Sequence, residues 1–294
     1  MVTETEINTP QQAENTDTEA TIIFVGDMMF DRYIRDTQGS DYTNTLDPEL
    51  ISYLNTADAV IGNLEGPITD FESVTNYHEN NPDHYRFTFS PDVIELLKLA
   101  NFKALLLGNN HIENFGNAGV KQTTDFLELA NLKHFGNPTA PSDYATLSFN
   151  DLDLALVAHN WFDSIPIEDT INLVSNLNNN HDYVIVMPHW GEEYETIANS
   201  KQTQEATLLI TAGADLIIGS HPHVVQNNDQ VDDTLIYYSL GNFVFDQYFS
   251  DAVRCGEIIK IKFSKNSITP IESRRIFLNG DGRTKLANTS ECTI

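Results

Sequence analysis

Short apolar runs alternate along this chain with segments whose apolar residues recur at helical spacing. The runs are rich in Val, Ile and Leu and lie at residues 21–25, 59–61, 104–107, 183–187, 215–218 and 234–238. Runs of this length and composition are typical of buried strands. Helical spacing occurs in segments 91–100, 120–130 and 202–212. The first of these helices is expected to have Ser90 as its N-cap and Pro91 at its first position. Strands that alternate with helices predict an α/β architecture.

Polar residues that can bind metals follow these apolar runs directly. In chain order they are Asp27, Asn63 and Glu65, Asn110 and His111, His189, and the pair His221 and His223. In open α/β sheets the functional crevice lies beyond the carboxyl ends of the strands. We therefore expect these side chains to share one site. We also expect a single domain around it, because the clusters continue from residue 26 to residue 246.

The residue types at these positions suit a divalent metal ion. Neutral imidazoles and carboxylates, with no thiolate among them, are ligands for zinc, iron or manganese. Pro222 fixes a bend between His221 and His223, which would turn both imidazoles toward one crevice. In the alternative interpretation these residues cap helices and fill loops independently of one another. Six polar clusters at successive strand ends, the sixth being the one that contains Asn242 after residues 234–238, favour the metal site over that alternative.

The two ends of the chain differ from its centre. Residues 1–20 are polar and lack both the basic and the apolar region of a signal peptide, so we expect a flexible leader. The domain is expected over residues 21–280. Within it, segment 257–263 alternates apolar and polar residues as a half-exposed strand does, and segment 268–277 is expected to complete a hairpin with it. Residues 281–294 are expected to form a polar, peripheral tail.

Composition adds the constraint of charge. The chain has 294 residues, of which 40% are hydrophobic, so it is long enough for a substantial core. It carries 43 acidic and 16 basic residues, which gives a formal net charge of −27. General electrostatics therefore exclude nucleic acid and anionic membrane surfaces as partners. A small or polymeric anionic substrate would need a local positive site, for which a bound metal is the obvious candidate.

Six motifs resemble those of a known family. In chain order they read GDMMFDR, GNLEGPIT, NNHIENFG, HWGEEYE, GSHPHVVQ and YYSLGNFVFDQ. Over about residues 22–256, their order resembles the CapA family of bacterial capsule (poly-gamma-glutamate) synthesis proteins. That family is similar to the calcineurin-like metallophosphoesterases. The resemblance implies a sandwich of two mixed β-sheets flanked by helices, in the order α/β/β/α. It also implies a metal-dependent hydrolase that acts on a phosphoester or an amide through a metal-bound water.

The resemblance also implies a ligand set for one or two divalent ions, with manganese, iron or zinc as candidates. Asp27 resembles the aspartate that opens the phosphoesterase metal site. Asn63 or Glu65 stands where those enzymes place an aspartate that bridges two metals. Asn110 resembles their asparagine ligand.

Four histidines complete the site that the resemblance implies. His189 resembles the isolated histidine ligand of the phosphoesterases. His221 and His223 resemble the pair that closes their site, one to each metal. His111 resembles the histidine that protonates the leaving group, and it is therefore the expected catalytic residue.

Three positions depart from the family patterns. Phosphoesterases usually have Asp-x-His in the first motif, whereas this chain has Met29 in the third position. A thioether is a poor ligand for the ions expected here. Either Asn63 or the longer Glu65 replaces the bridging aspartate. Asn114 replaces the aspartate that follows the histidine by three in the CapA pattern, which weakens a carboxylate pairing with His111. A site for a single metal is therefore an alternative.

Further polar residues are expected near the centre, where they would orient ligands or contact substrate. They are Asn109, Glu193, Asn242, Asp246 and Arg254. Asn242 and Asp246 could instead satisfy the backbone of their loop. Arg254 could pair with a substrate anion or with one of the many carboxylates of the chain.

Two hypotheses about function follow. In the first, the protein is a metal-dependent hydrolase. In the second, it is a non-catalytic, metal-binding accessory component of polyanion synthesis or export, in a capsule-synthesis membrane complex. Its location would be the bacterial cell surface or another extracytoplasmic site if an N-terminal anchor was removed, and the cytoplasm otherwise. Cys255 and Cys292 could pair in an oxidising compartment or remain free thiols.

Overall fold

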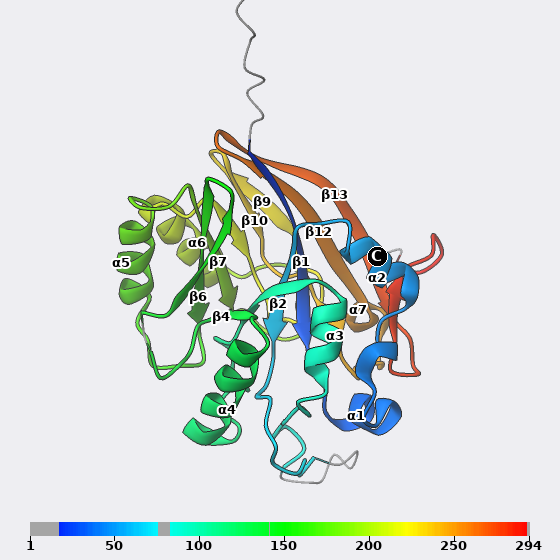
Figure 1. Ribbon diagram of the computed structural model, residues 1–294. Coiled ribbons are helices and arrows are strands. Elements are labelled where there is room, and N and C mark those ends of the chain that lie inside the picture. The colour runs from blue at the N-terminus through cyan, green and yellow to red at the C-terminus, as the bar shows by residue number, and fades with distance from the viewer. Residues whose placement is uncertain (1–17, 76–82, 141, 293–294) are drawn as a thin grey trace, which may run out of the picture.

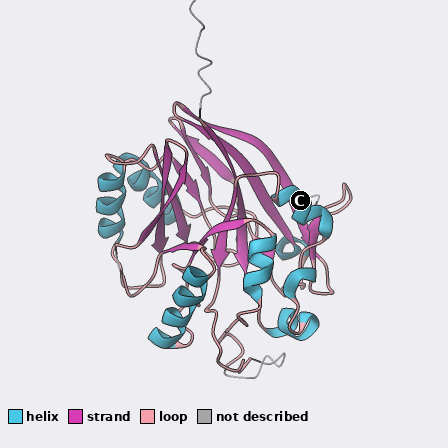
Figure 2. Ribbon diagram, viewed as in Figure 1, coloured by secondary structure: helices cyan, strands magenta, loops and turns pink. Residues whose placement is uncertain are grey.

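Two mixed β-sheets pack face to face in the computed structural model, which describes residues 18–75, 83–140 and 142–292 (Figure 1 and Figure 2). In spatial order, the first sheet consists of β14 (Thr284–Leu286), β13 (Ser267–Leu278), β12 (Cys255–Ser264), β1 (Glu19–Met28), β2 (Ala59–Leu64), β3 (Phe102–Leu106) and β4 (Lys133–Phe135). Beyond this path, β11 (Asn242–Val244) pairs with β1. The second sheet consists of β5 (Tyr144–Phe149), β6 (Leu152–Asn160), β7 (Tyr183–His189), β8 (Leu216–Ile218), β10 (Thr234–Tyr237) and β9 (Asn228–Val231).

Each sheet has a parallel centre with antiparallel strands beside it. In the first sheet β1, β2, β3 and β4 are parallel neighbours, and β12 joins β1 in the antiparallel sense. In the second sheet β6, β7, β8 and β10 are parallel, with β5 and β9 antiparallel at the two edges. The carboxyl ends of the parallel strands therefore gather on one side of the molecule.

Helices cover the outer faces of both sheets. The helices packed on the first sheet are α1 (Arg32–Gln38), α2 (Pro48–Leu54), α3 (Val93–Leu99) and α4 (Gly116–Leu129), and those on the second are α5 (Ile167–Leu177) and α6 (Ser200–Ala212). A 3-10 turn (Tyr42–Asn44) and the short α7 (Asp251–Arg254) lie in the connections. The layers thus follow the order α/β/β/α, as the sequence predicts. None of the helices in the described segments qualifies as a membrane span.

The apolar runs are unbroken because both faces of each central strand are buried. On β1, Ile22 and Phe24 pack between the sheets, whereas Ile23 and Val25 pack against the helices. On β6, Leu154 and Leu156 face the other sheet, and the residues between and after them face α5 and α6. Successive side chains point to opposite faces of a strand, so covering both faces requires apolar residues throughout.

The helix expected at residues 91–100 begins only at Val93. The N–H of Val93 donates to Ser90 O, and Ser90 Oγ donates to Asp92 Oδ2. Ser90 and Pro91 therefore form a turn that precedes the helix, and Ser90 does not serve as its N-cap. The expected hairpin is present: β12 and β13 pair antiparallel from Ser264 with Ser267 onward.

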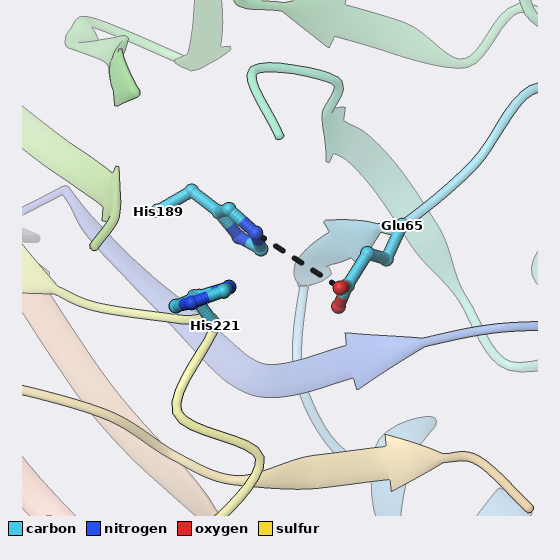
Figure 3. Close-up of side chains that lie close together, drawn as sticks. All are labelled: Glu65, His189 and His221. Carbon is cyan, nitrogen blue, oxygen red and sulfur yellow. Dashed lines mark ion pairs between the residues drawn. The ribbon is translucent and has the colours of Figure 1, made fainter. Parts of the chain in front are cut away.

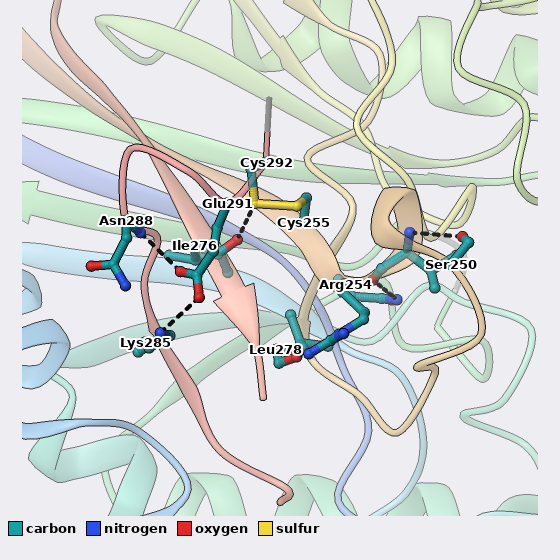
Figure 4. Close-up of a disulfide and its surroundings, with 11 residues drawn as sticks. Ser250, Arg254, Cys255, Ile276, Leu278, Lys285, Asn288, Glu291 and Cys292 are labelled. Atoms are coloured by element: carbon teal, nitrogen blue, oxygen red, sulfur yellow. Dashed lines mark hydrogen bonds and ion pairs between the residues drawn. A yellow bond between two sulfur atoms is a disulfide. The ribbon is translucent and has the colours of Figure 1, made fainter. Parts of the chain in front are cut away.

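The C-terminal segment is not a peripheral tail. Thr284 is buried at the start of β14, where its hydroxyl donates to Phe243 O and its N–H to Thr45 O. Cys292 forms a disulfide with Cys255 at the start of β12, with 5.4 Å between their Cα atoms (Figure 4). Over its described residues, the segment expected to be a polar tail is thus attached to the domain by a short strand and a disulfide. A polar composition concealed both a strand at the edge of the sheet and a covalent attachment.

Candidate metal centre

Five side chains from both sheets converge at the ends of their strands. Asp27 lies on β1, Glu65 directly follows β2 and His189 ends β7, while His221 and His223 occupy the loop after β8. All five are at most 4% exposed. Because β1 and β2 are parallel, as are β7 and β8, side chains at their carboxyl ends face one crevice.

These donors form two groups that share Glu65. One group is Asp27, Glu65 and His223, and the donor atoms of each group lie within 4.8 Å of one another. The other group is Glu65, His189 and His221, which Figure 3 shows. Oε1 of Glu65 lies 3.6 Å from Nε2 of His223 and 3.9 Å from Nε2 of His189. Donors about 2.1 Å from one tetrahedral ion are themselves about 3.4 Å apart, so this spacing suits coordination. The structure places His221 and His223 in different groups.

Two atoms of this cluster are buried without a hydrogen bond. Glu65 Oε1 and His221 Nδ1 have no hydrogen-bond partner in the part of the chain that the structure describes, although Glu65 Oε1 forms longer ion pairs with His189 and His223. Burial raises the pKa of Glu65 well above its usual range and lowers the pKa of His221 to about 3. An unpaired buried carboxylate oxygen is destabilising, and a divalent cation among these donors would satisfy it. The residues present therefore fit a metal ion that accepts carboxylate and imidazole ligands.

Asn242 orients the ring of His223. Nδ2 of Asn242 donates to Gln247 Oε1 and to Val253 O, each at 3.0 Å, so its Oδ1 is the atom that faces His223. Nδ1 of His223 lies 2.9 Å from this oxygen and donates to it. Nε2 is consequently directed at Glu65. Burial alone would lower the pKa of His223, but the charges of Glu65 and Asp27 raise it to about 9.

His189 has a similar support. Its Nδ1 lies 3.0 Å from Ser220 Oγ, and this hydroxyl donates to Pro188 O at 3.1 Å. In the tautomer that donates from Nδ1 to Ser220, Nε2 presents its lone pair toward Glu65 and toward Asn110 Oδ1, which is 3.0 Å away. Asn110 is thereby placed beside the group of Glu65, His189 and His221. The position of Ser220, next to His221 in the GSHPH motif, is the signal that sequence reasoning missed.

Asn63 and Asn109 form a buried network behind the centre. Nδ2 of Asn63 donates to Asp27 Oδ1 at 2.8 Å, and Oδ1 of Asn63 accepts from Nδ2 of Asn109 at 3.0 Å. Asn109 Oδ1 in turn accepts the N–H groups of His111 and Ile112. Asn63 thus turns its amide N–H toward Asp27 rather than an oxygen toward a shared ion. Glu65 is the residue that the two donor groups share.

Met29 is buried near the same strand end but turns away from coordination. Its Sδ accepts the backbone N–H of Asp31 at 3.0 Å. The group of Asp27, Glu65 and His223 therefore has three protein donors among the described residues, whereas the other group has Asn110 beside its three. The two candidate positions are unequal.

His111 lies beside the centre with one ring nitrogen fixed. Asn114 Oδ1 accepts the N–H of Phe87 at 2.7 Å and lies 3.1 Å from Nδ1 of His111. Nδ1 therefore carries a proton, and Nε2 carries the lone pair. The ring packs on Phe87, with 4.4 Å between centroids. Burial lowers the pKa of His111 to about 4, so the imidazole is neutral at neutral pH.

Of the remaining expected residues, Asp246 and Glu193 lie near the centre. Asp246 forms a buried ion pair with Arg32, the first residue of α1. Glu193 is exposed on the loop after β7. The pKa values of Glu65 and His223 are determined mainly by burial and by nearer charges, and the negative charge of Glu193 raises both of them by a smaller amount. Sequence reasoning missed Arg32, although it ends the GDMMFDR motif.

Arg254 lies elsewhere, next to the disulfide (Figure 4). Its Nε donates to Leu278 O at 3.1 Å, and its guanidinium packs 4.2 Å from the centre of the Phe277 ring. The structure therefore gives Arg254 a backbone and an aromatic partner, and its charge also interacts with the carboxylate of Glu291. Phe162, in contrast, lies at the centre without any signal in the sequence. Its half-exposed ring is 4.3 Å from that of His221.

The fold has a counterpart among solved structures. A novel phosphatase from Mycoplasma pneumoniae aligns with this chain at a TM-score of 0.52 and 16% sequence identity. The alignment covers 89% of this chain and 94% of that one. At this identity the likeness shows the fold alone. It confirms the expected phosphatase-like sandwich of two mixed sheets flanked by helices.

Two relatives named for PGA or capsule biosynthesis align with most of this chain. The PGA biosynthesis protein CapA of Bacillus subtilis (strain 168) is 30% identical over 287 residues, which cover 90% of this chain and 74% of that protein. The capsule biosynthesis protein CapA of Bacillus anthracis is 32% identical over 248 residues, covering 77% of this chain and 60% of that protein. The model of the family described as bacterial capsule synthesis protein PGA_cap matches residues 21–247. The chain belongs to this family of bacterial capsule synthesis proteins.

Proposed function

We propose that this protein is a metal-dependent hydrolase of capsule (poly-gamma-glutamate) synthesis that acts on a phosphoester or an amide. One observation carries the proposal: two buried donor groups meet at Glu65, whose Oε1 has no hydrogen-bond partner within the described segments. Membership of the capsule synthesis family supports the process. The phosphatase-like fold is compatible with the reaction class, although a fold alone does not assign a substrate.

Asp27, Glu65 and His223 would hold one divalent ion, and Glu65, His189 and His221 a second, with manganese, iron or zinc as candidates. When bound, such ions act as Lewis acids and bring the pKa of water toward ~7. Asn242 and Ser220 keep the rings of His223 and His189 in the orientation that directs Nε2 at Glu65. The chain therefore holds its ligands in position before an ion arrives.

We assign the proton transfer to Nε2 of His111. Its Nδ1 proton is retained by Asn114, and burial keeps the free ring neutral at neutral pH. Nε2 accepts a proton from the attacking water and then delivers it to the leaving oxygen or nitrogen. The ring is thereby restored at the end of each turnover.

The test measures turnover and metal content together. Protein loaded with manganese, zinc or iron is assayed on bis-p-nitrophenyl phosphate and on γ-glutamyl-p-nitroanilide. We expect His111→Asn to lower turnover about 10²–10⁴-fold while metal per chain, measured by elemental mass spectrometry, stays constant. His181→Asn is the matched control. His181 lies two residues before the start of β7, at the end of the strand away from His189, and its ring contacts Thr146. Equal turnover in wild type and His111→Asn, or loss of metal with His111, would contradict the assignment.

A second candidate function is a non-catalytic accessory role in polyanion synthesis or export, within a capsule-synthesis membrane complex. Met29, with its Sδ turned to the backbone of Asp31, favours this candidate, because it leaves one donor group with three protein ligands. The accessory role predicts bound metal without turnover. It also predicts that affinity for poly-γ-glutamate rises with salt, because a chain of net charge −27 repels a polyanion everywhere except at a local site. An affinity for poly-γ-glutamate that falls as salt increases would exclude binding confined to such a local site.

We further propose that the protein works outside the cytoplasm, at the bacterial cell surface. The Cys255–Cys292 disulfide supports this location, because disulfides persist in oxidising compartments and are rare in the cytosol. Trapping thiols with N-ethylmaleimide in intact cells of the source organism should label neither cysteine. Labelling of both would place the protein in a reducing compartment.

A further inference from the structure

A pocket of about 260 Å³ lies beside the metal centre. Arg32 and Asp246 line one part of it, and Tyr85 and Tyr194 line another. The ring of Tyr194 is 6.3 Å from that of His223, a member of the first donor group. The ring of Phe87 links the pocket to His111, because its centroid lies 4.9 Å from Cζ of Arg32 and 4.4 Å from the centroid of the His111 ring. The pocket therefore adjoins both a metal-binding group and the residue assigned to proton transfer.

The buried position and the backbone conformation of Arg32 at this pocket are energetically unfavourable. Of the lysines and arginines that the structure describes, it is the one in the buried class, at 7% exposed. Its backbone has a φ of 50°, which is unfavourable for a long side chain. Its Nε is buried and has no hydrogen-bond partner among the described residues. Costs of this kind persist where function requires them, at ligand sites above all.

The guanidinium is held in one orientation before any ligand binds. One face packs on Phe87, with Cζ 4.9 Å from the ring centre, and Phe245 lies 5.7 Å away. Nη2 pairs with Asp246, which also accepts the N–H of Tyr33. Nη1 donates to Nε2 of His84 at 3.2 Å, and His84 lines the same pocket. Asp246 and His84 therefore hold the guanidinium in place among the residues that line the pocket.

The opposite wall is strained as well. Tyr194 has a φ of 67°, and its N–H donates to the carbonyl of Pro222, between the two histidines of the metal centre. Its hydroxyl accepts from Nε2 of Gln247 at 3.3 Å, and Gln247 also lines the pocket. Polar groups of Arg32, Tyr194 and Gln247 thus face one cavity next to the metal centre.

From this juxtaposition we infer that Arg32 binds a second anionic group of the substrate, a carboxylate or a phosphate, next to the bond that is hydrolysed. The inference rests on the proposed function and adds the substrate class to it: an acidic molecule with one group at the metals and another at Arg32. A guanidinium supplies charge-assisted hydrogen bonds to either anion. In a chain of net charge −27 this buried cation is the element that distinguishes an acidic substrate from a neutral one.

The test measures binding of glutarate and of inorganic phosphate to the manganese-loaded protein by calorimetry. The double variant Arg32→Gln with Asp246→Asn removes both charges of the pair, so it leaves no unpaired buried carboxylate. We expect it to weaken binding of at least one probe roughly 10- to 100-fold, with unchanged metal content. The probe affected identifies the anion as carboxylate or phosphate. Arg283→Gln is the control, because Arg283 is half exposed and pairs with Asp281 in the turn before β14.

Arg32→Lys serves as a second variant, since it keeps the charge and its pairing with Asp246 but loses the planar fork. A loss of about tenfold is expected for it, and this result stands even if the double variant does not fold. Affinities within twofold of wild type in Arg32→Lys and the double variant, or no binding of either probe to wild type, overturn the inference. Turnover is measured separately. If the protein hydrolyses the model substrates but the Arg32 variants bind both probes as wild type does, only the inference about Arg32 is contradicted. If no turnover is found but the Arg32 variants bind glutarate more weakly, only the proposed hydrolase activity is contradicted.

Discussion

At the scale of single residues, Met29 distinguishes the two donor groups. Its thioether accepts a backbone N–H and leaves Asp27, Glu65 and His223 as the protein donors of their group. We expect Met29→His to raise bound metal from about one to about two per chain after equilibration with a competing chelator. The added imidazole supplies the nitrogen ligand that zinc, iron and manganese prefer to a thioether.

Met29→Leu is the matched control, because it changes the side chain without adding a donor, and its metal content should equal that of wild type. Elemental mass spectrometry of the three proteins at equal chelator concentration makes the comparison. Two ions already retained by the wild type would show that Met29 does not limit occupancy.

Single members of the two donor groups were predictable from the sequence where a motif coincides with the end of a strand. Asp27, His189, His221 and His223 satisfy both conditions. The choice between Asn63 and Glu65 was not predictable, because it depends on the direction of each side chain, which a spacing of two residues does not determine. Arg32 was not predicted as a site residue, because its partner Asp246 is 214 positions away in the sequence. Only the folded chain brings the two together.

At the scale of elements, the close approach of β1 and β11 positions the centre. A Cβ on Gly26 would lie 1.8 Å from Gly241 O, the atom that accepts the N–H of Asp27. We expect Gly26→Ala to force the strands apart, to lower the free energy of unfolding by about 1–3 kcal/mol, and to weaken metal binding. Urea denaturation and metal content measure the two effects.

Gly280→Ala is the control for this substitution. A Cβ at Gly280 meets no atom within 4 Å among the described residues, and its backbone is not in the left-handed region. Its free energy of unfolding should stay within about 0.5 kcal/mol of wild type. If Gly26→Ala behaves like Gly280→Ala, then the contact between β1 and β11 does not hold Asp27 in place.

The helices and strands that are most deeply buried were the easiest to predict from the sequence. The central strands stand out because both faces are covered, so their residues are apolar throughout. Helices α1, α2 and α5 were not predicted, whereas α3 was, although it has only seven residues, because five of the seven are apolar. Strand β14 was missed because three residues at a sheet edge, Thr284 to Leu286, need no apolar pattern.

At the scale of the whole molecule, the disulfide closes a loop across the edge of the first sheet. Cys255 and Cys292 are 37 positions apart. We expect reduction to lower the free energy of unfolding by about 3–4 kcal/mol, because the unfolded chain regains the entropy of an open loop. Urea denaturation with and without a phosphine reductant measures the difference.

The double variant Cys255→Ser with Cys292→Ser provides the control, because its stability should not respond to the reductant at all. It should also match the reduced wild type. Coincident unfolding curves for oxidised and reduced wild type would show that the C-terminal segment is held by β14 and its hydrogen bonds alone.

The wide separation of the ligands along the chain has a consequence for biosynthesis. Asp27 hydrogen-bonds the backbone of His221 across 194 positions, so no nascent fragment contains both donor groups until most of the chain has left the ribosome. A chain that is translocated unfolded would complete the centre only after export. The metal ions available in the compartment where the chain finishes folding, and not those where it is translated, would then determine which ion is bound. Producing the same sequence with and without an export signal should yield the same fold filled with different metals.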